Sequence, residues 1–161
     1  MFQPVEYKGT LQEGFTTLFK QLDALLEGET EQTANLANAA ALLNQFLDEV
    51  NWVGFYLYQE QKEELVLGPF QGLPACVRIP MKKGVCGTAA NERRTVRVAD
   101  VTAFPGHIAC DGATRSEIVV PLVKESQLIG VLDIDSPVDN RFSKEEEQYL
   151  EQFADILLKH I

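Results

Sequence analysis

The feature that most constrains the fold is a pair of strand-like segments near the C-terminus, separated by only three polar residues. The segments are SEIVVPLV at 116–123 and QLIGVLDID at 127–135, with Lys-Glu-Ser between them. Both are rich in the β-branched residues that are typical of strands. Connections this short join antiparallel strands, so the two segments are expected to form a hairpin.

The N-terminal half of the chain shows two helical patterns followed by a second hairpin pattern. Apolar residues recur at helical spacing between about 11 and 26, and again from 36 to 50, where Thr30 is a candidate cap. The aromatic and β-branched run at 52–58 and the shorter run ELVLG at 64–68 are separated by a polar turn. These two runs indicate a hairpin.

The second half is expected to contain a short helix at 84–92, a strand at 95–98 and a long loop at 99–115. The chain ends in a helix, for which Ser143 and Glu146 form a capping-box pattern. Short connections between successive strands favour an antiparallel sheet that is covered by helices. We therefore expect an α+β fold, with the sheet flanked by N- and C-terminal helices, in one domain spanning residues 1–161.

Composition excludes several classes of function. Fourteen basic and 24 acidic residues give a formal net charge of -10, which would repel the backbone of a nucleic acid. No segment approaches the length of a membrane-spanning helix and the N-terminus lacks a signal-peptide pattern, so no membrane association and a cytoplasmic location are expected. In that reducing compartment three cysteines are not expected to form a structural disulfide framework, whereas a transient disulfide remains compatible.

Three acidic side chains are expected to meet on the C-terminal hairpin. Asp133 and Asp135 are two residues apart in a strand, so their side chains share a face. A hairpin centred on Glu125 sets Glu117 opposite Asp133 and diagonal to Asp135. The reverse face would then be continuously apolar and would pack against helices, with the residues Ile118, Val120, Leu122, Leu128, Leu132 and Ile134.

Such a cluster of acids has three interpretations. Carboxylates this close repel one another, so at least one would have a raised pKa and could donate a proton near neutral pH. Alternatively, the cluster binds a cation, either a metal ion or the ammonium group of an amino-acid-like ligand. In the third interpretation the acids never meet and lie at a solvated end of the strand.

All three cysteines lie in short segments punctuated by glycine or proline. Cys76 is in LPACVRI, Cys86 in KGVCGT and Cys110 in GHIACDG, where turns can expose a sulfur, and this indicates thiol chemistry. An inert packed cysteine is the alternative, and it suits Cys86 best because its neighbours are small. A zinc site formed by the three cysteines and His107 is a further alternative, although the chain has no Cys-x-x-Cys pair.

Two other patterns bear on a binding site. The glycines of GVCGTA lack the spacing of a phosphate-binding loop, which disfavours nucleotide hydrolysis. Trp52 and Tyr56 fall on one face of their strand and could wall a small apolar pocket, although aromatic residues in strands most often serve packing.

Five segments of the chain together resemble the free methionine-(R)-sulfoxide reductases. They are NWVGFYL at 51–57, GPFQGLPACVRIP at 68–80, GVCGTA at 84–89, VTAFPGHIACDGATRSEIVVPL at 101–122 and GVLDIDSP at 130–137. The resemblance is strong over 51–161 and includes the N-terminal helices in outline. It implies a GAF-type fold and an oxidoreductase acting on sulfur that reduces free L-methionine-(R)-sulfoxide to L-methionine.

The resemblance also implies unequal roles for the cysteines. Cys110 would attack the sulfoxide sulfur, which releases methionine and leaves a sulfenic acid. Cys76 would be the main resolving cysteine and Cys86 a second one, so that the sulfenic acid ends as a disulfide. Thioredoxin would then reduce this disulfide.

For the substrate, the resemblance implies that Glu117, Asp133 and Asp135 are binding carboxylates, and that Trp52 and Tyr56 line the pocket for the methyl sulfoxide. No cofactor and no metal would be required, and the protein would be a homodimer. The alternative function is a non-catalytic GAF-type sensor or binding module, which holds a small ligand without turnover.

Overall fold

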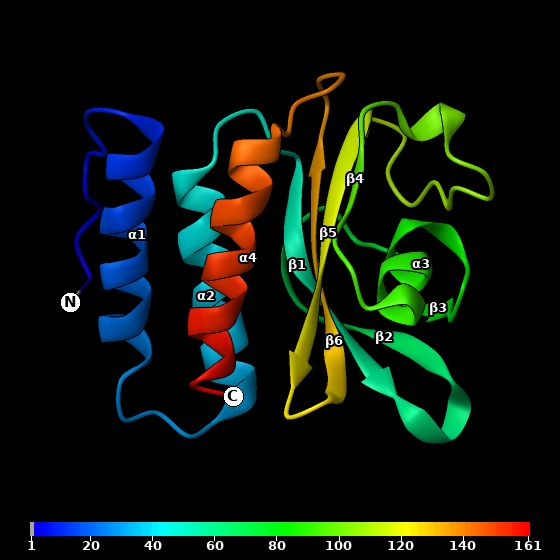
Figure 1. Cartoon of the computed structure of the whole chain (residues 1–161), viewed down its shortest axis with the longest axis horizontal. Helices are drawn as coiled ribbons and strands as arrows, with labels where there is room; N and C mark the ends of the chain where they lie inside the picture. Colours follow the sequence, from blue (N-terminus) through cyan, green and yellow to red (C-terminus); the bar gives the residue numbers. More distant parts are fainter. Residues whose placement is uncertain (1) are drawn as a thin grey trace.

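Six strands form one antiparallel sheet, and helices cover both of its faces in the computed structural model, which describes residues 2–161 (Figure 1). The elements are α1 (Leu11–Leu26), α2 (Gln32–Phe46), β1 (Trp52–Gln59), β2 (Glu64–Gly72), β3 (Arg78–Pro80), α3 (Gly84–Glu92), β4 (Val96–Val98), β5 (Ser116–Lys124), β6 (Gln127–Ser136) and α4 (Lys144–Leu158). Short 3-10 helices span Glu60–Lys62 and Val101–Ala103.

The strands lie in the order β3-β2-β1-β6-β5-β4, and each neighbouring pair is antiparallel. The helices α2 and α4 cover one face, α1 lies outside them, and α3 packs on the other face (Figure 1). The prediction of an antiparallel sheet flanked by N- and C-terminal helices is confirmed. Among residues 2–161, no helix has the length and apolar character needed to cross a membrane.

A side-chain cap marks the start of α4 but not that of α2. Ser143 and Glu146 form the predicted capping box at the start of α4. The predicted cap at Thr30 is wrong, because α2 begins at Gln32 and has no side-chain cap. The carboxylate of Glu29 instead accepts hydrogen bonds from the backbone N–H groups of Thr30 and Glu31, both at 2.8 Å.

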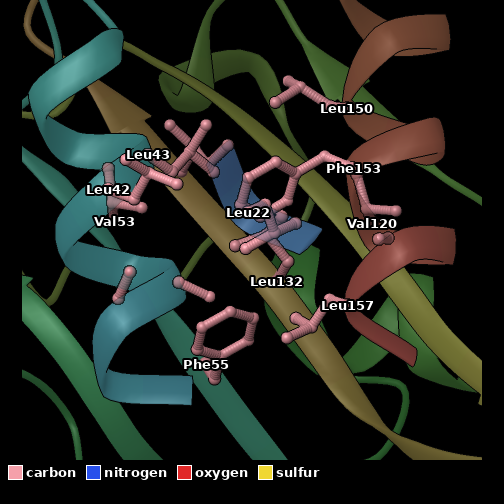
Figure 2. Packing of buried hydrophobic residues seen from close by; sticks show 14 of the residues in the cluster. Leu22, Leu42, Leu43, Val53, Phe55, Val120, Leu132, Leu150, Phe153 and Leu157 are labelled. Carbon is pink, nitrogen blue, oxygen red and sulfur yellow. The ribbon is translucent and has the colours of Figure 1, made fainter. Parts of the chain in front are cut away.

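The main apolar core fills the space between the sheet and the helical layer (Figure 2). Side chains from α1, α2 and α4 meet those of the central strands there, among them Leu22, Leu42, Leu43, Val53, Phe55, Val120, Leu132, Leu150, Phe153 and Leu157. Fully burying an apolar side chain of this size stabilises the fold by about 1.5–3 kcal/mol. This core holds the central strands in place, and these strands also carry the side chains of the opposite face.

The register of the β5–β6 hairpin differs from the prediction by two residues. Glu125 and Ser126 have positive φ values of 51° and 65°, so a two-residue turn joins the strands. A bulge near this turn adds one residue to β6. Glu117 therefore pairs with Asp135, and the predicted pairing with Asp133 is wrong. Because the difference is an even number of residues, Glu117 still shares a face with both aspartates.

The same bulge reverses the faces of the residues next to the turn. Leu128 packs with the apolar cluster on the α3 side of the sheet, so its predicted place against the other helices is wrong. Ile129 packs on the main core instead. An extra residue in one strand breaks the regular alternation of side chains between the two faces of the sheet. The rest of the predicted apolar face is buried in the main core, namely Ile118, Val120, Leu122, Leu132 and Ile134.

The edge strand β3 is short and directly follows the segment that carries Cys76. It pairs with β2 only over residues 64–66 of that strand, and β2 then continues through Pro69 to Gly72. Proline is tolerated in a strand where one edge lacks a partner. Pro69 lies beyond the stretch that β3 covers, which explains why it does not end β2.

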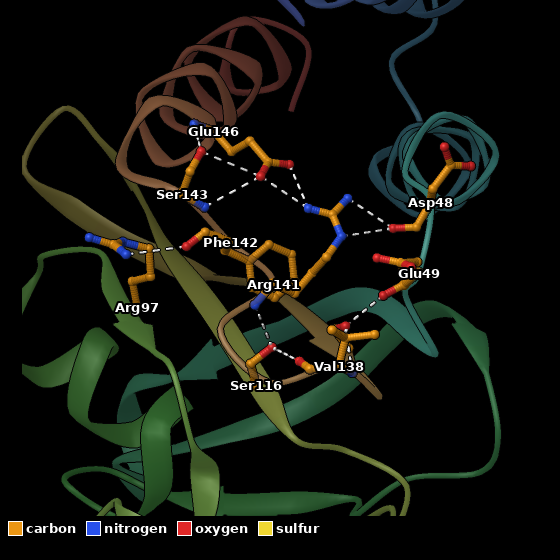
Figure 3. Close-up of polar contacts among 10 residues, drawn as sticks. Asp48, Glu49, Arg97, Ser116, Val138, Arg141, Phe142, Ser143 and Glu146 are labelled. Atoms are coloured by element: carbon orange, nitrogen blue, oxygen red, sulfur yellow. Dashed lines mark hydrogen bonds and ion pairs between the residues drawn. The ribbon is translucent and has the colours of Figure 1, made fainter.

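A polar network joins the end of α2 to the start of α4 (Figure 3). The guanidinium of Arg141 donates to both carboxylate oxygens of Glu146, at 3.0 and 2.8 Å, and to the carbonyl oxygen of Asp48. The side chains of Arg141 and Glu146 are only 14% and 10% exposed, so solvent screens this ion pair weakly. The network therefore links the start of α4 to the segment that follows α2, on the face of the sheet opposite to α3.

Candidate active site

A pocket lies on the face of the sheet that carries α3. Its empty space is about 540 Å³, part of which is open to solvent. Strands β1, β5 and β6 supply its floor, while the first turn of α3 and two loops supply its walls. Seven of the eight residues singled out from the sequence line it, namely Trp52, Tyr56, Cys86, Cys110, Glu117, Asp133 and Asp135.

The three carboxyl groups converge at the floor of this pocket. Glu117 and Asp133 are each only 6% exposed, and Asp135 is partly exposed. One oxygen each of Asp133 and Asp135 is buried without a hydrogen-bond partner among residues 2–161. Such groups are costly to bury unless a donor reaches them. The acids therefore do meet, and they present acceptors to the pocket.

Burial keeps these carboxyl groups protonated to an unusually high pH. It raises the pKa of Glu117 well above the ordinary value, and repulsion from Asp133 and then Asp135 raises it further. The pKa of Asp135 is likewise raised well above its ordinary value by burial and then by Asp133. Burial raises the pKa of Asp133 too, although contacts with Glu117 and Cys86 oppose this rise. A cluster of this kind can both donate a proton and bind a cation.

Two aromatic side chains from β1 form one wall of the pocket. The rings of Trp52 and Tyr56 stack with their centroids 5.8 Å apart, and Phe70 stacks on Trp52 at 5.1 Å. Gly54 makes this stack possible, because a Cβ there would lie 2.3 Å from Cβ of Phe70. The result is a flat apolar surface beside the acids.

The same aromatic residues hold the loop that carries Cys76. Nε1 of Trp52 donates to the carbonyl oxygen of Leu73 at 3.1 Å. The hydroxyl of Tyr56 donates to the carbonyl oxygen of Cys76 at 2.9 Å. Burial raises the pKa of Tyr56 above its ordinary value, and the negative charge of the nearby Asp133 raises it further. The hydroxyl therefore keeps its proton and remains a donor. Both contacts position the Cys76 loop over the pocket.

Cys76 and Cys110 form a disulfide in this structure. Their Cα atoms are 5.6 Å apart, although the residues are separated by 34 positions in the sequence. Cys110 lines the pocket, whereas Cys76 is not among the lining residues. The four-ligand zinc site considered from the sequence is not formed, because two of its sulfurs are bonded to each other.

Cys86 is a free and buried thiol in the first turn of α3. It is 4% exposed, and its Sγ lies 3.9 Å from Oε1 of Glu117. Burial raises its pKa well above the ordinary value, and the charges of Asp133 and Glu117 add to this effect. Cys86 is therefore a protonated thiol here, whereas nucleophilic cysteines are thiolates.

Cys86, Glu117 and Asp133 also offer a small binding site for a cation. One donor atom from each residue lies within 4.8 Å of the other two. Asp133, one of these three residues, has a buried oxygen without a hydrogen-bond partner among the described residues. An ammonium group carries three N–H donors, for which the carboxyl oxygens of Glu117 and Asp133 are the acceptors.

The loop that carries Cys110 is fixed by residues that the sequence did not reveal. Asn51, directly before β1, donates from Nδ2 to Oδ2 of Asp111 at 3.0 Å and to Oγ1 of Thr114 at 3.1 Å. His107 in this loop has its Nε2 3.8 Å from Oε2 of Glu117. Burial lowers the pKa of His107, which favours the neutral ring. The only sequence signal for Asn51 is its position at the start of the aromatic strand.

The start of α3 faces the pocket as well. Lys83, Gly84 and Val85 line it, and the helix has no side-chain cap. The first N–H groups of a helix lack partners within the helix and attract anions. Lys83 adds a positive charge beside them. The pocket thus has an acidic floor and a basic rim.

This fold and site define a GAF domain. A comparison with known families matches residues 21–161 to the GAF domain, and the chain belongs to that family. The protein YtsP of Bacillus subtilis (strain 168) is 56% identical over 159 residues, which are 99% of this chain and 98% of that protein. The free methionine-R-sulfoxide reductase of Escherichia coli (strain K12) is 54% identical over 142 residues, which are 88% of this chain and 85% of that enzyme.

A solved structure gives the same result. The free methionine-R-sulfoxide reductase of Neisseria meningitidis, in complex with its substrate, superposes with a TM-score of 0.92 at 42% identity and covers 99% of this chain and 95% of that one. Within the GAF family, the chain belongs with the free methionine-R-sulfoxide reductases, which are oxidoreductases acting on sulfur.

Proposed function

We propose that this protein reduces free L-methionine-(R)-sulfoxide to L-methionine with Cys110 as the nucleophile. The observation that carries the proposal is the disulfide between Cys110, at the wall of the pocket, and Cys76, just outside it. A module that only holds a ligand needs no such pair. The three carboxyls in the same pocket provide the acid and the ammonium site that a free amino acid sulfoxide requires.

The pocket matches the substrate group by group. The ammonium of the amino acid is held by the acids, where oxygens of Asp133 and Asp135 lack a partner. Its carboxylate faces the uncapped start of α3 and Lys83. The methyl sulfoxide lies along the ring of Trp52 and that of Tyr56. A methionine sulfoxide inside a polypeptide lacks the free ammonium, which explains a preference for the free amino acid.

In the first step, the thiolate of Cys110 attacks the sulfoxide sulfur. The S–O bond breaks after its oxygen accepts a proton from a neutral carboxyl group, and we assign this role to Glu117, a buried pocket residue whose pKa burial raises well above its ordinary value. The oxygen transfers to Cys110 as a sulfenic acid, and methionine leaves. The cysteine is oxidised by two electrons and the sulfoxide is reduced by two.

In the second step, the thiol of Cys76 attacks the sulfenic acid of Cys110. Water leaves, and the disulfide seen in the structure forms. Thioredoxin reduces this disulfide to complete the cycle. We place the cycle in the cytoplasm, where thioredoxin keeps thiols reduced, and take the protein to be a homodimer, as the resemblance implies.

The decisive experiment is to incubate the purified protein with free methionine-(R)-sulfoxide and dithiothreitol and to quantify methionine. We expect catalytic amounts of methionine from the (R) isomer, and little from the (S) isomer or from a peptide containing methionine sulfoxide. The Cys110→Ser variant is the control that removes the nucleophile. Absence of methionine with the wild type, or full activity of Cys110→Ser, would defeat the proposal and favour a ligand-binding sensor.

A further inference from the structure

The two sulfurs of the disulfide have different surroundings. Cys110 lines the pocket, whereas Cys76 lies outside the lining. In thiol–disulfide exchange, the attacked sulfur bonds to the incoming thiolate and the other sulfur leaves. A protein reductant is too large to enter a pocket of about 540 Å³, so it approaches the disulfide from the side of Cys76.

Apolar side chains flank Cys76: Leu73 lines the mouth of the pocket, whereas Val77 lies outside the lining. Leu73 is 63% exposed and Val77 is 59% exposed, which makes them the two most exposed large apolar residues within 2–161. One lies three positions before Cys76 and the other directly follows it. Exposed apolar side chains that gather beside a reactive group indicate a contact surface for another protein.

The segment of the chain that carries this surface is basic, whereas the chain as a whole is acidic. The segment from 65 to 91 contains no acidic residue, although the chain has a net charge of -10. It contains Arg78, Lys82 and Lys83, which are all exposed, and Arg78 pairs with Glu64. An apolar centre with a basic rim fits a partner whose dithiol lies in an apolar surface with an acidic rim.

We propose that an external protein dithiol attacks Sγ of Cys76 while it docks on Leu73 and Val77. The thiolate of the reductant bonds to Cys76, the bond to Cys110 breaks, and the electron pair leaves on Sγ of Cys110. The second thiol of the reductant then attacks the sulfur that is bonded to Cys76 and releases Cys76 as a thiolate. Two electrons pass to this protein, two protons complete both thiols, and the reductant becomes a disulfide. This inference rests on the proposed function and adds the attacked sulfur and the docking surface.

Trapping the mixed disulfide tests the choice of sulfur. The protein is first oxidised to the Cys76–Cys110 disulfide and then mixed with a thioredoxin whose second active-site cysteine is replaced by serine. Trypsin places the three cysteines on separate peptides, 63–78, 84–93 and 98–115, so mass spectrometry identifies the linked residue. We expect the adduct on the peptide that carries Cys76. An adduct on the peptide that carries Cys110 overturns the proposal.

A charge introduced at the apolar centre of the surface tests the docking. Val77→Glu places a negative charge against a partner surface that is expected to be apolar with an acidic rim. Val5→Glu, on the distant N-terminal segment, is the matched control. We expect Val77→Glu to lower kcat/KM for thioredoxin about tenfold, as for a contact at the centre of an interface, without lowering the rate with dithiothreitol. An unchanged kcat/KM for thioredoxin, or an equal loss with dithiothreitol, refutes the docking surface.

These outcomes are separable from failure of the proposed function. The adduct experiment needs only oxidised protein and no sulfoxide. Absence of methionine formation with dithiothreitol defeats the reductase assignment, whatever the adduct position. Normal turnover with dithiothreitol combined with an adduct on Cys110 leaves the reductase in place and removes the present inference.

Discussion

Sγ of Cys86, in the wall of the pocket, donates toward Oε1 of Glu117, in its floor, at 3.9 Å, and both groups are buried. Burial raises the pKa of the Cys86 thiol and that of the Glu117 carboxyl, so both groups hold their protons near neutral pH. A thiol in this state is a weak nucleophile. We therefore assign the Cys86 thiol the role of a hydrogen-bond donor to the carboxyl group of Glu117.

The first prediction concerns which cysteines form the disulfide. After one equivalent of free methionine-(R)-sulfoxide without reductant, thiol titration should leave one free thiol per wild-type chain, because Cys76 and Cys110 pair and Cys86 does not. The Cys86→Ala variant should leave none. Cys76→Ala is the control and should accumulate the sulfenic acid. If Cys86→Ala keeps one free thiol, with Cys110 left as the sulfenic acid, Cys86 is required for resolution and the prediction is wrong.

The second prediction concerns the proton donor. Glu117→Gln should lower kcat about 100-fold or more, because an amide cannot supply the proton that the sulfoxide oxygen needs. In the wild type, kcat should fall as pH rises through the raised pKa of the carboxyl cluster, since only the protonated form donates. Asp135→Asn serves as the comparison. Wild-type rates and pH profiles in both variants would exclude these two acids as donors.

The third prediction concerns stability. The folded pKa of Asp133 is raised by burial above its unfolded value of about 3.9, so the unfolded state loses its proton first as pH rises. Stability therefore falls between that pH and the folded pKa. Asp133→Asn carries no charge and should raise the free energy of unfolding by about 1 kcal/mol at pH 8, with the gain vanishing near pH 4. Urea denaturation at both values checks this, and a gain that is equal at pH 4 would contradict it.

The fourth prediction separates the two chemical steps. Tyr56→Phe removes the hydrogen bond to the carbonyl oxygen of Cys76 and keeps the ring. Loss of one such bond is worth about 1 kcal/mol, so disulfide formation should slow by up to about tenfold. The first burst of methionine in a rapid-quench experiment should remain. Equal slowing of both steps would show that the hydroxyl acts on the substrate and not on the Cys76 loop.

The fifth prediction uses the polar network of the helical layer. Arg141→Met leaves the carboxylate of Glu146 buried without its cation and should lower the free energy of unfolding by about 2–3 kcal/mol. Arg97→Met is the control, because Arg97 and Glu147 are 33% and 23% exposed and such pairs contribute about 1 kcal/mol or less. Activity with dithiothreitol should persist in both variants. Equal losses measured in urea would contradict the argument from burial.

Strand periodicity was sufficient to predict the acidic floor of the pocket. The predicted pairing of Glu117 was wrong by two residues, yet the side chain stayed on the face of Asp133 because alternation has a period of two. The same reasoning failed for Leu128, which lies on the turn side of the bulge. An odd displacement moves a side chain to the other face, and although Gly130 is a residue type that favours a bulge, it does not fix which neighbour is the extra residue.

Other parts of the site had no sequence signal. Cys76 and Cys110 are 34 residues apart, so no local rule pairs them, and their link was implied only by the resemblance. The contacts from Trp52 and Tyr56 end on backbone carbonyl oxygens, which every residue possesses. Sequence patterns reveal which side chains face a pocket, whereas contacts to the backbone depend on how the loop is folded.

In the proposed mechanism, substrate recognition and redox chemistry come from different parts of the fold. The three carboxyls and the two aromatic walls come from strands that rest on the main core, whereas Cys76 and Cys110 come from loops outside the strands. Replacing both cysteines leaves the acids and aromatic residues where they are. In this mechanism, loss of the two loop cysteines would abolish turnover and leave a pocket that still binds its ligand, which is a short evolutionary path between catalysis and sensing.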